Sequence, residues 1–254
     1  MKNTNQGEKQ KRHYEAIHSE YVFHYFDEYS LKYREKVIFP TLLDGIDFNG
    51  LNLADLASGC GFNSVTIKKS FPRVKLSGFD ISNLAVAEYI KVVKSEAYKC
   101  DLLKINSLPK NKFDIAVIVG GIHHLTANLP VVITNIHQSL RPGGMLLIFE
   151  PNKDFFLNGI REFWYRLDRY FDQENESALS HDKLAFLARD FFKIDRVSYG
   201  GSIGYFLVLN SLVFRMPKLI KNLYSPFLIY VDKLTSKFSG KKISPFYIAR
   251  WVKI

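Results

Sequence analysis

Two glycines, Gly59 and Gly61, stand where a short apolar run gives way to apolar residues at helical spacing. The run covers residues 51–56 and carries one acid, Asp55. A buried strand that ends in a glycine turn and opens a helix is a cofactor-binding element of open α/β sheets, because glycine lets the backbone approach a ligand closely. A second apolar run ends in Asp80. Its carboxylate is placed to accept hydrogen bonds from both hydroxyls of a ribose.

Acid–base chemistry is suggested by two adjacent histidines and a glutamate at the ends of predicted buried strands. His123 and His124 follow the run 112–119, and Glu150 ends the run 145–150. Histidine titrates near neutral pH, so either ring is a candidate general base. Adjacent side chains on an extended segment point apart, so we expect at most one ring to face a ligand. The alternatives are structural hydrogen bonding by the histidines and, for Glu150, substrate orientation or bonds to backbone amides.

Strand-like and helix-like runs alternate along the chain, which predicts an α/β fold. Runs typical of strands lie near residues 51–56, 74–79, 97–100, 112–119, 145–150, 192–199 and 245–254. Helical patterns cover residues 13–38, 61–70, 81–93, 131–140, 155–171 and 180–191. In open α/β sheets, ligands bind in the crevice outside the carboxyl ends of the strands, so the candidate residues are expected to line that crevice.

These motifs and their order resemble the class I S-adenosylmethionine-dependent methyltransferases over about residues 50–150. The resemblance rests on the acid and glycine turn, on Asp80, on the strand 112–119 and on the stretch Leu140-Arg141-Pro142-Gly143-Gly144. The family usually has three alternating glycines after the acid, and here Ala57 stands in the place of the first. The resemblance implies a Rossmann-like seven-stranded sheet, mostly parallel with an antiparallel last strand. It also implies helices on both faces and helical insertions after strands five and six.

A cofactor and its binding residues follow from the same resemblance. The cofactor would be S-adenosyl-L-methionine, an acid at the position of Asp101 would cap its adenine amino group, and the N-terminal helical region would serve as a lid. The cofactor-binding residues expected on this basis are Asp55, Ala57, Ser58, Gly59, Cys60, Gly61, Asp80, Ile81, Asp101, Leu102, Gly120 and, from the lid, Tyr21. No spacing of metal ligands occurs in the sequence, and we expect no metal.

The chain is expected to divide into an N-terminal segment and one domain. Residues 1–39 would form a polar tail, disordered through Arg12 and without the apolar core of a secretory signal, followed by an aromatic helical lid. Residues 40–254 would form the methyltransferase domain, with insertions at about 152–180 and 202–244. Aromatic residues in the first insertion commonly build the acceptor pocket in this family, and plain core packing is the alternative.

Positive charge is concentrated toward the C-terminal end of the chain. The formal net charge is +10, and residues 214–254 carry nine basic residues against a single acid, Asp232. Such asymmetry indicates an anionic partner: lipid headgroups, nucleic acid or a phosphorylated substrate. No apolar run in the 202–244 insertion reaches the roughly 20 residues that span a bilayer. Its apolar and basic residues favour contact with an anionic membrane surface or a lid over an apolar acceptor, and a packed lid or a dimer contact stays open.

The leading interpretation is a methyltransferase that acts on a small or lipid-linked acceptor, at oxygen, nitrogen or carbon. Nucleic acid is a less favoured acceptor. Amino-base methyltransferases of this fold carry an Asn- or Asp-Pro-Pro-aromatic loop where this chain has Gly120-Gly121-Ile122-His123. The two cysteines, Cys60 and Cys100, are typical of reduced thiols, so we expect a cytoplasmic protein, with peripheral contact to the inner face of a membrane left open.

Two other functions remain open from the sequence. The pattern Gly59-x-Gly61-x-x-Ser64 nearly matches the dinucleotide fingerprint and would suit a nicotinamide-dependent oxidoreductase. Its last glycine is a serine, however, and that function does not explain the Arg-Pro-Gly-Gly stretch. The third interpretation is a non-catalytic, methyltransferase-like subunit that serves interactions at a membrane.

Overall fold

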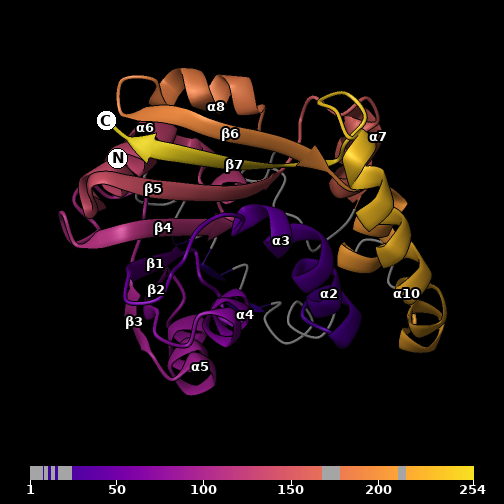
Figure 1. Cartoon of the computed structure of the whole chain (residues 1–254), viewed down its shortest axis with the longest axis horizontal. Helices are drawn as coiled ribbons and strands as arrows, with labels where there is room; N and C mark the ends of the chain where they lie inside the picture. Colours follow the sequence, from indigo (N-terminus) through magenta and orange to yellow (C-terminus); the bar gives the residue numbers. More distant parts are fainter. Residues whose placement is uncertain (1–7, 9–10, 13–14, 17–24, 168–177, 211–215) are drawn as a thin grey trace.

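Seven strands form one sheet in the part of the chain that the computed structural model describes, which is residues 8, 11–12, 15–16, 25–167, 178–210 and 216–254 (Figure 1). Their order is β3-β2-β1-β4-β5-β7-β6. Strand β7 is antiparallel to both neighbours, and the other pairs are parallel. The strands are β1 Asn52–Leu56, β2 Lys75–Asp80, β3 Glu96–Lys99, β4 Phe113–Val119, β5 Leu140–Pro151, β6 Phe192–Gly200 and β7 Phe246–Lys253. The predicted seven-stranded sheet with an antiparallel last strand is confirmed.

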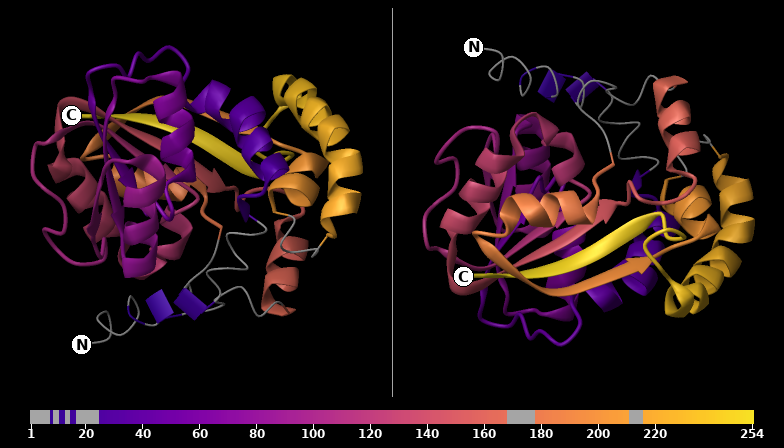
Figure 2. Two further views of the ribbon diagram at one scale, coloured as in Figure 1. Left: turned by 90° about the horizontal axis from the view of Figure 1, so that it is seen from below. Right: turned by 90° about the horizontal axis from the view of Figure 1, so that it is seen from above.

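Helices lie on both faces of this sheet, as predicted (Figures 1 and 2). The α-helices are α2 Glu28–Tyr33, α3 Phe39–Leu42, α4 Phe62–Ser70, α5 Asn83–Val93, α6 Leu129–Ser139, α7 Asn158–Leu167, α8 His181–Ala188 and α10 Lys218–Thr235. Two segments have π-helical geometry, η1 Arg34–Ile38 and η4 Tyr205–Leu209, and three are short 3₁₀ turns, η2 Ile122–His124, η3 Thr126–Asn128 and η5 Ser236–Phe238.

Two clusters of buried apolar side chains occupy the two faces, because successive residues of a strand point to opposite sides of the sheet. In β1, Ala54 and Leu56 belong to the cluster that includes α6 and α8, while Leu53 belongs to the cluster that includes α3, α4 and α5. Each fully buried aliphatic side chain of this size contributes about 1.5–3 kcal/mol. The strand ends that carry the candidate residues are therefore held by packing on both sides.

The N-terminal helix predicted over residues 13–38 is broken at Asp27. The Asp27 carboxylate accepts hydrogen bonds from the backbone N–H groups of Tyr29 at 2.9 Å and Ser30 at 3.0 Å, and so caps a new helix, α2. One unbroken helix was therefore a wrong prediction. In the predicted disordered tail, Glu8, Lys11 and Arg12 are described and have helical backbone, and disorder of the tail stays a prediction.

Strand β5 begins at Leu140, before the Pro142-Gly143-Gly144 stretch and earlier than the predicted start at residue 145. A shift in its register with β4 leaves residues 141–144 without partners in β4. Gly143 has a φ of +71°, in the left-handed region that glycine adopts without strain. The residues predicted to turn thus interrupt the pairing without ending the strand.

The 202–244 insertion is tied to the N-terminal segment by a buried carboxylate. Asp232 of α10 accepts hydrogen bonds from Tyr33 Oη of α2 at 2.6 Å and from the backbone N–H of Ser202 at 3.0 Å. The backbone N–H groups of Gly204 and Tyr205 donate to the same carboxylate at 3.1 Å and 2.9 Å. Because these donors come from three separate elements, the single acid of the basic C-terminal stretch fixes how those elements meet.

A buried ion pair forms a second link between the same elements. Lys221 Nζ of α10 contacts the carboxylate of Asp27 and lies 2.8 Å from Ser30 Oγ, which also contacts the backbone oxygen of Val208 at 3.0 Å. Helix α10 and η4 are therefore docked on the start of α2. Across the described residues, helices of sufficient length and apolarity to traverse a bilayer are absent.

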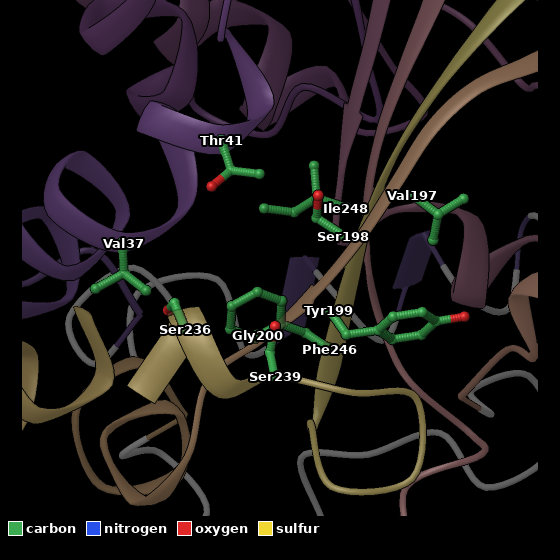
Figure 3. Close-up of a pocket in the computed structure, with 10 residues that line it drawn as sticks. All are labelled: Val37, Thr41, Val197, Ser198, Tyr199, Gly200, Ser236, Ser239, Phe246 and Ile248. Carbon is green, nitrogen blue, oxygen red and sulfur yellow. The ribbon is translucent and has the colours of Figure 1, made fainter. Parts of the chain in front are cut away.

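A cavity of about 320 Å³ lies where β6 and β7 meet η1, α3 and the region of η5 (Figure 3). Figure 3 shows Thr41, Ser198 and Ile248 gathered on one side of the β6–β7 ribbon, with the side chains of Val197 and Tyr199 on the other. The residues that line this cavity include none of the predicted cofactor or catalytic residues. It is therefore separate from the candidate site.

Candidate cofactor and acceptor site

The glycine turn between β1 and α4 contains two glycines with different tasks. Both have positive φ, +52° at Gly59 and +81° at Gly61. A Cβ atom on Gly61 would come within 2.3 Å of Val93 Cγ2 and 2.6 Å of Tyr89 Cδ2, whereas a Cβ on Gly59 would meet nothing within 4 Å. Gly61 therefore allows close helix packing, while Gly59 faces open space. Ala57 adopts φ +50° at the position where the family usually has glycine.

Asp80 at the end of β2 closes this turn. Its carboxylate accepts hydrogen bonds from the backbone N–H of Gly59 at 2.8 Å and of Ser82 at 2.9 Å. Burial raises the pKa of Asp80, and the hydrogen bonds from the backbone of Ser82, Gly59 and Ile81 oppose that rise. The predicted neighbour relationship between the glycine turn and Asp80 is thus present in the structure. Contact of Asp80 or Ile81 with a cofactor stays a prediction.

Asp55 lies behind the turn and not on its open side. Its buried carboxylate accepts a hydrogen bond from Ser64 Oγ at 2.6 Å, and Ser64 Oγ lies 2.8 Å from Tyr89 Oη. Burial raises the pKa of Asp55 to about 7, with the Ser64 hydrogen bond opposing the rise and the charge of Asp80 adding to it. This chain of contacts joins β1, α4 and α5 beneath the turn, so Asp55 supports the turn from below.

Ser58 and Cys60, on either side of Gly59, differ in the hydrogen bonding of their side chains. Ser58 is buried, and its Oγ has no hydrogen-bond partner among the described residues. A buried hydroxyl without a partner is unfavourable unless a ligand or water completes it. Cys60 Sγ donates to Glu88 Oε2 at 2.8 Å, and burial, followed by this bond and the charge of Glu88, raises the pKa of the thiol. Neither cysteine forms a disulfide within the part of the chain that the structure describes.

The remaining predicted cofactor residues lie around the neighbouring strand ends. Asp101 follows β3, and its Oδ1 accepts from the backbone N–H of Leu103 at 3.0 Å, while Leu102 is buried. Gly120 follows β4 with φ +68° and donates its N–H to the backbone oxygen of Phe149 at 2.8 Å. Tyr21 lies outside the described residues. The placement of Asp101 at the end of β3 agrees with its predicted position, and its contact with adenine stays a prediction.

Glu150 joins two strand ends through a buried carboxylate. Its Oε1 accepts hydrogen bonds from the backbone N–H groups of Gly121 at 2.9 Å and Ile122 at 2.6 Å. Its Oε2 lies 2.7 Å from His123 Nδ1. The Nδ1 side of the His123 ring therefore faces a carboxylate that also accepts two backbone N–H groups. The predicted bonding to backbone amides is present.

The two histidines do not point apart. They lie in the 3₁₀ turn η2, where successive side chains are not on opposite sides, and their ring centroids are 3.8 Å apart with the planes tilted by 43°. The expectation from an extended segment was therefore wrong. His123 contacts Glu150. The charge of His124 lowers the pKa of Asp80, an influence smaller than burial and the backbone hydrogen bonds. The pair thus connects the Glu150 side of the crevice to the Asp80 side.

Residues that the sequence did not single out bring the N-terminal segment, predicted as a lid, to this turn. Phe26 stacks on Phe62, the first residue of α4, with ring centroids 4.7 Å apart. Glu15 Oε1 accepts a hydrogen bond from Ser82 Oγ at 3.2 Å, next to Asp80. The aromatic spacing in the sequence drew attention to the tyrosines of this segment and not to Phe26. These contacts place described parts of the segment against the candidate cofactor site.

Tyr247 is a second residue that the sequence did not single out. It is paired with Glu150 across the β5–β7 ladder, and its buried Oη has no partner among the described residues. Burial, followed by the charge of Glu150, raises the pKa of Tyr247 well above its ordinary value. The phenol therefore stays protonated and can donate a hydrogen bond.

Comparison with known proteins agrees with this geometry. Residues 54–146 match the family model described as a methyltransferase domain, and no curated protein matches the chain. A possible histamine N-methyltransferase from Thermotoga maritima is 17% identical, with a TM-score of 0.64 over 96% of this chain and 99% of that one. A methyltransferase from Archaeoglobus fulgidus is 14% identical, with a TM-score of 0.61 over 93% and 99%.

A third similar structure contains both a cofactor product and an acceptor. It is phosphoethanolamine N-methyltransferase 2 of Haemonchus contortus, in complex with phosphomonomethylethanolamine and S-adenosylhomocysteine. It is 14% identical, with a TM-score of 0.58 over 92% of this chain and 59% of that one. At these identities the likeness concerns the fold. Residues 54–146 thus match a methyltransferase domain, and the chain has the fold of S-adenosylmethionine-dependent methyltransferases.

Proposed function

We propose that the chain methylates a small or lipid-linked acceptor held beside His123 and Glu150. The observation that carries this proposal is the 2.7 Å contact between His123 Nδ1 and the buried Glu150, at the strand end next to the glycine turn. A cofactor-binding turn alone would serve a binding protein equally well. A histidine oriented by a buried carboxylate is the arrangement of a general base.

The turn suits the cofactor of this class. The space over Gly59, the partnerless Ser58 Oγ and the acceptor-only carboxylate of Asp80 offer room, a hydroxyl and an acceptor within one loop. We place the ribose hydroxyls at Asp80, the methionine portion over Gly59 and the adenine next to Asp101 and Leu102. Phe26, stacked on Phe62, would cover this region and exclude water.

The roles of the chain's own residues follow from their contacts. S-adenosylmethionine, when bound, supplies an electrophilic methyl group on its sulfonium sulfur. Glu150 contacts the His123 ring at Nδ1, and we assign to His123 the proton that an O–H or N–H acceptor loses. Glu150 also holds the backbone of Gly121 and Ile122, which keeps the turn that carries both histidines in place. The greater part of the rate enhancement would come from alignment of the acceptor.

Other interpretations are less well supported. The strand order with an antiparallel β7 between β5 and β6 differs from the 3-2-1-4-5-6 order of the dinucleotide-binding fold, which disfavours the nicotinamide oxidoreductase. A small acceptor agrees with the acceptor named for the Haemonchus enzyme. A non-catalytic subunit would have the same fold as the proposed enzyme, and it would differ from the enzyme in transferring no methyl group.

Calorimetric titration with S-adenosylhomocysteine and with NAD tests the cofactor. Transfer of a labelled methyl group to a panel of amines, phenols and amphiphilic acceptors tests catalysis. We expect binding of S-adenosylhomocysteine, no binding of NAD, and transfer to a member of the panel that His123→Asn reduces. Cofactor binding with no transfer to any class of acceptor would favour the non-catalytic subunit instead.

A further inference from the structure

The outer face of α10 carries a stripe of large apolar side chains that contact little of the protein. Leu219 and Leu223 are each 85% exposed, Phe227 is 67% exposed and Tyr230 is 60% exposed. They recur every three or four residues and so lie along one side of the helix. We call these four residues the α10 stripe. Scattered exposed apolar residues are ordinary on a protein surface, but a continuous row marks an interaction site.

The opposite side of α10 already performs the packing that the fold requires. Lys221, Ser225, Leu228, Ile229 and Asp232 are buried there against α2 and η4. The α10 stripe is therefore not explained by the stability of the domain. A helix whose inner face is packed and whose outer face is apolar has an unused binding surface.

A second helix presents apolar residues at the same end of the molecule. Figures 1 and 2 show α7 and α10 at the end toward which β5 and β6 run. Strands β1, β2 and β4 are parallel to β5, so the candidate residues at their ends lie toward the same end of the sheet. Phe156 and Ile160 are exposed there, and Phe163 of α7 is exposed as well. The backbone N–H of Phe156 donates to the backbone oxygen of Lys242 at 2.8 Å, which joins this region to the insertion that contains α10.

The exposed charged side chains among the described residues 216–244 are all positive. Lys218, Lys233 and Lys242 are exposed, whereas the single acid of this range, Asp232, is buried. Exposed lysines next to an exposed apolar row match the requirements of a helix that lies in the interface of an anionic bilayer. A protein partner would need only the apolar row, so the uniform positive charge favours the membrane.

We propose that α10 lies flat on an anionic membrane, with the α10 stripe inserted among the acyl chains and the flanking lysines at the headgroups. This deepens the proposed function and rests on it, because the crevice then faces the bilayer and its acceptor is an amphiphile held in the membrane. The buried contacts of α10 with Asp27 and Tyr33 connect the docked helix to the N-terminal segment over the cofactor turn. Docking would therefore hold the site's cover in a fixed position.

Vesicle flotation tests the docking. The full chain is mixed with vesicles of phosphatidylcholine alone, or with vesicles that also contain about 30 mol% of the anionic lipid phosphatidylserine. Each mixture is tested at low and at high salt. The test variant is Leu219→Glu/Leu223→Glu, and the matched control is Ile105→Glu, an apolar residue 74% exposed elsewhere on the surface. A charge variant, Lys233→Gln/Lys242→Gln, isolates the electrostatic part. Lys221 is unsuitable for this test because it is buried.

We expect the parent chain and the control to float with the anionic vesicles at low salt, less so at high salt. The double glutamate variant should lose at least about tenfold in partitioning, since two leucines no longer leave water. Equal flotation of that variant, or failure of the parent chain to float at low salt, overturns the proposal. Equal flotation on neutral vesicles overturns the choice of an anionic surface.

Two further measurements separate the proposals from one another. Light scattering of lipid-free protein detects a dimer, and a dimer that Leu219→Glu/Leu223→Glu dissolves would replace the membrane with a second copy. Calorimetry with S-adenosylhomocysteine should give the same affinity for all variants. A parent chain that floats but does not bind S-adenosylhomocysteine would end the proposed function and leave the docking standing.

Discussion

Glu150 Oε2 lies 2.7 Å from His123 Nδ1, and this contact orients the His123 ring. The carboxylate is fully buried and is also held by two backbone N–H groups, so the ring is oriented from a rigid point. In the proposed function, His123 takes the proton that the acceptor loses. The adjacent His124 is not in this contact and can serve as its control.

We expect His123→Asn to lower kcat by about 10²–10⁴-fold, the usual contribution of a general base. The affinity for S-adenosylhomocysteine should stay within about twofold, because that change removes a proton acceptor and leaves the turn intact. Steady-state kinetics with the acceptor identified by labelled methyl transfer provides kcat, and calorimetry provides Kd. His124→Asn should retain kcat, and an equal loss in both variants would contradict the assignment of the base to His123.

Asp80→Ala should weaken the binding of S-adenosylhomocysteine by about 1–3 kcal/mol, because two ribose hydroxyls lose their acceptor. This corresponds to roughly a 5- to 150-fold rise in Kd. The backbone N–H groups of Gly59 and Ser82 lose the same acceptor, so the melting temperature should fall too. Titration calorimetry on folded protein separates these effects. Asp47→Ala, an exposed acid on the surface, is the control, and unchanged affinity in Asp80→Ala would remove the ribose from this position.

The two glycines of the turn should respond differently to alanine. Gly59→Ala should cost about 1–2 kcal/mol of stability for its left-handed φ and should raise Kd for S-adenosylhomocysteine at least about tenfold, because its Cβ occupies the ligand's space. Gly61→Ala meets Val93 and Tyr89 as well and should unfold at clearly lower denaturant. Urea unfolding and calorimetry give both numbers. Normal binding in Gly59→Ala would show that the cofactor lies elsewhere.

Because Asp55 loses its proton as the pH rises, the free energy of unfolding should fall. Its pKa is about 7 in the folded chain against 3.8 ordinarily, so the folded state holds the proton more tightly between about pH 4 and pH 7. The contribution is complete below about pH 4 and is lost as pH rises through about 7. Asp55→Asn should therefore flatten the decline of unfolding free energy between pH 5 and 8, measured by urea titration at each pH. An unchanged slope would show that Asp55 does not titrate in this window.

Lys221→Met should destabilise the chain by about 3 kcal/mol, since it leaves the largely enclosed carboxylate of Asp27 without its cation. The double variant with Asp27→Asn should lose less than the sum of the two single changes. Lys233→Met, an exposed lysine of the same helix, should stay within about 0.5 kcal/mol. Thermal and urea unfolding measure all four proteins. Additive losses would mean that the two side chains do not interact in solution.

Local patterns predicted the sheet and its cofactor edge well, because apolar runs, glycine turns and strand-end acids are short-range signals. They placed β1 and β2 within one or two residues, and with them the glycine turn and Asp80. The break at Asp27 was missed because aromatic residues continued at helical spacing across it, and a capping carboxylate overrides that pattern. The close contact between the two histidine rings was missed because β4 ends at Val119 and the 3₁₀ turn η2 follows, so the backbone is not extended there.

Long-range relationships could not be predicted from local patterns. Nothing near Asp232 in the sequence indicates that it receives donors from α2 and from Ser202, or that Lys221 would be buried while Lys218 is exposed. Whether such a side chain is buried or exposed depends on which face of α10 packs against the domain. That choice depends on the packing of elements nearly 200 residues apart in the chain, as the separation of 199 between Tyr33 and Asp232 shows.

The position of β7 inside the sheet sets an order of assembly. Strand β6 has β7 as its sole neighbour in the described sheet, and β7 follows the whole 202–244 insertion in the chain. During synthesis β6 must therefore wait for α10 to be made before it can join, with β5 presenting an open edge meanwhile. The contacts between β6 and β7 join residues that are far apart along the chain, and such contacts form slowly during folding. A nascent chain will thus expose the apolar face of α10 to its surroundings before the sheet that anchors it is complete.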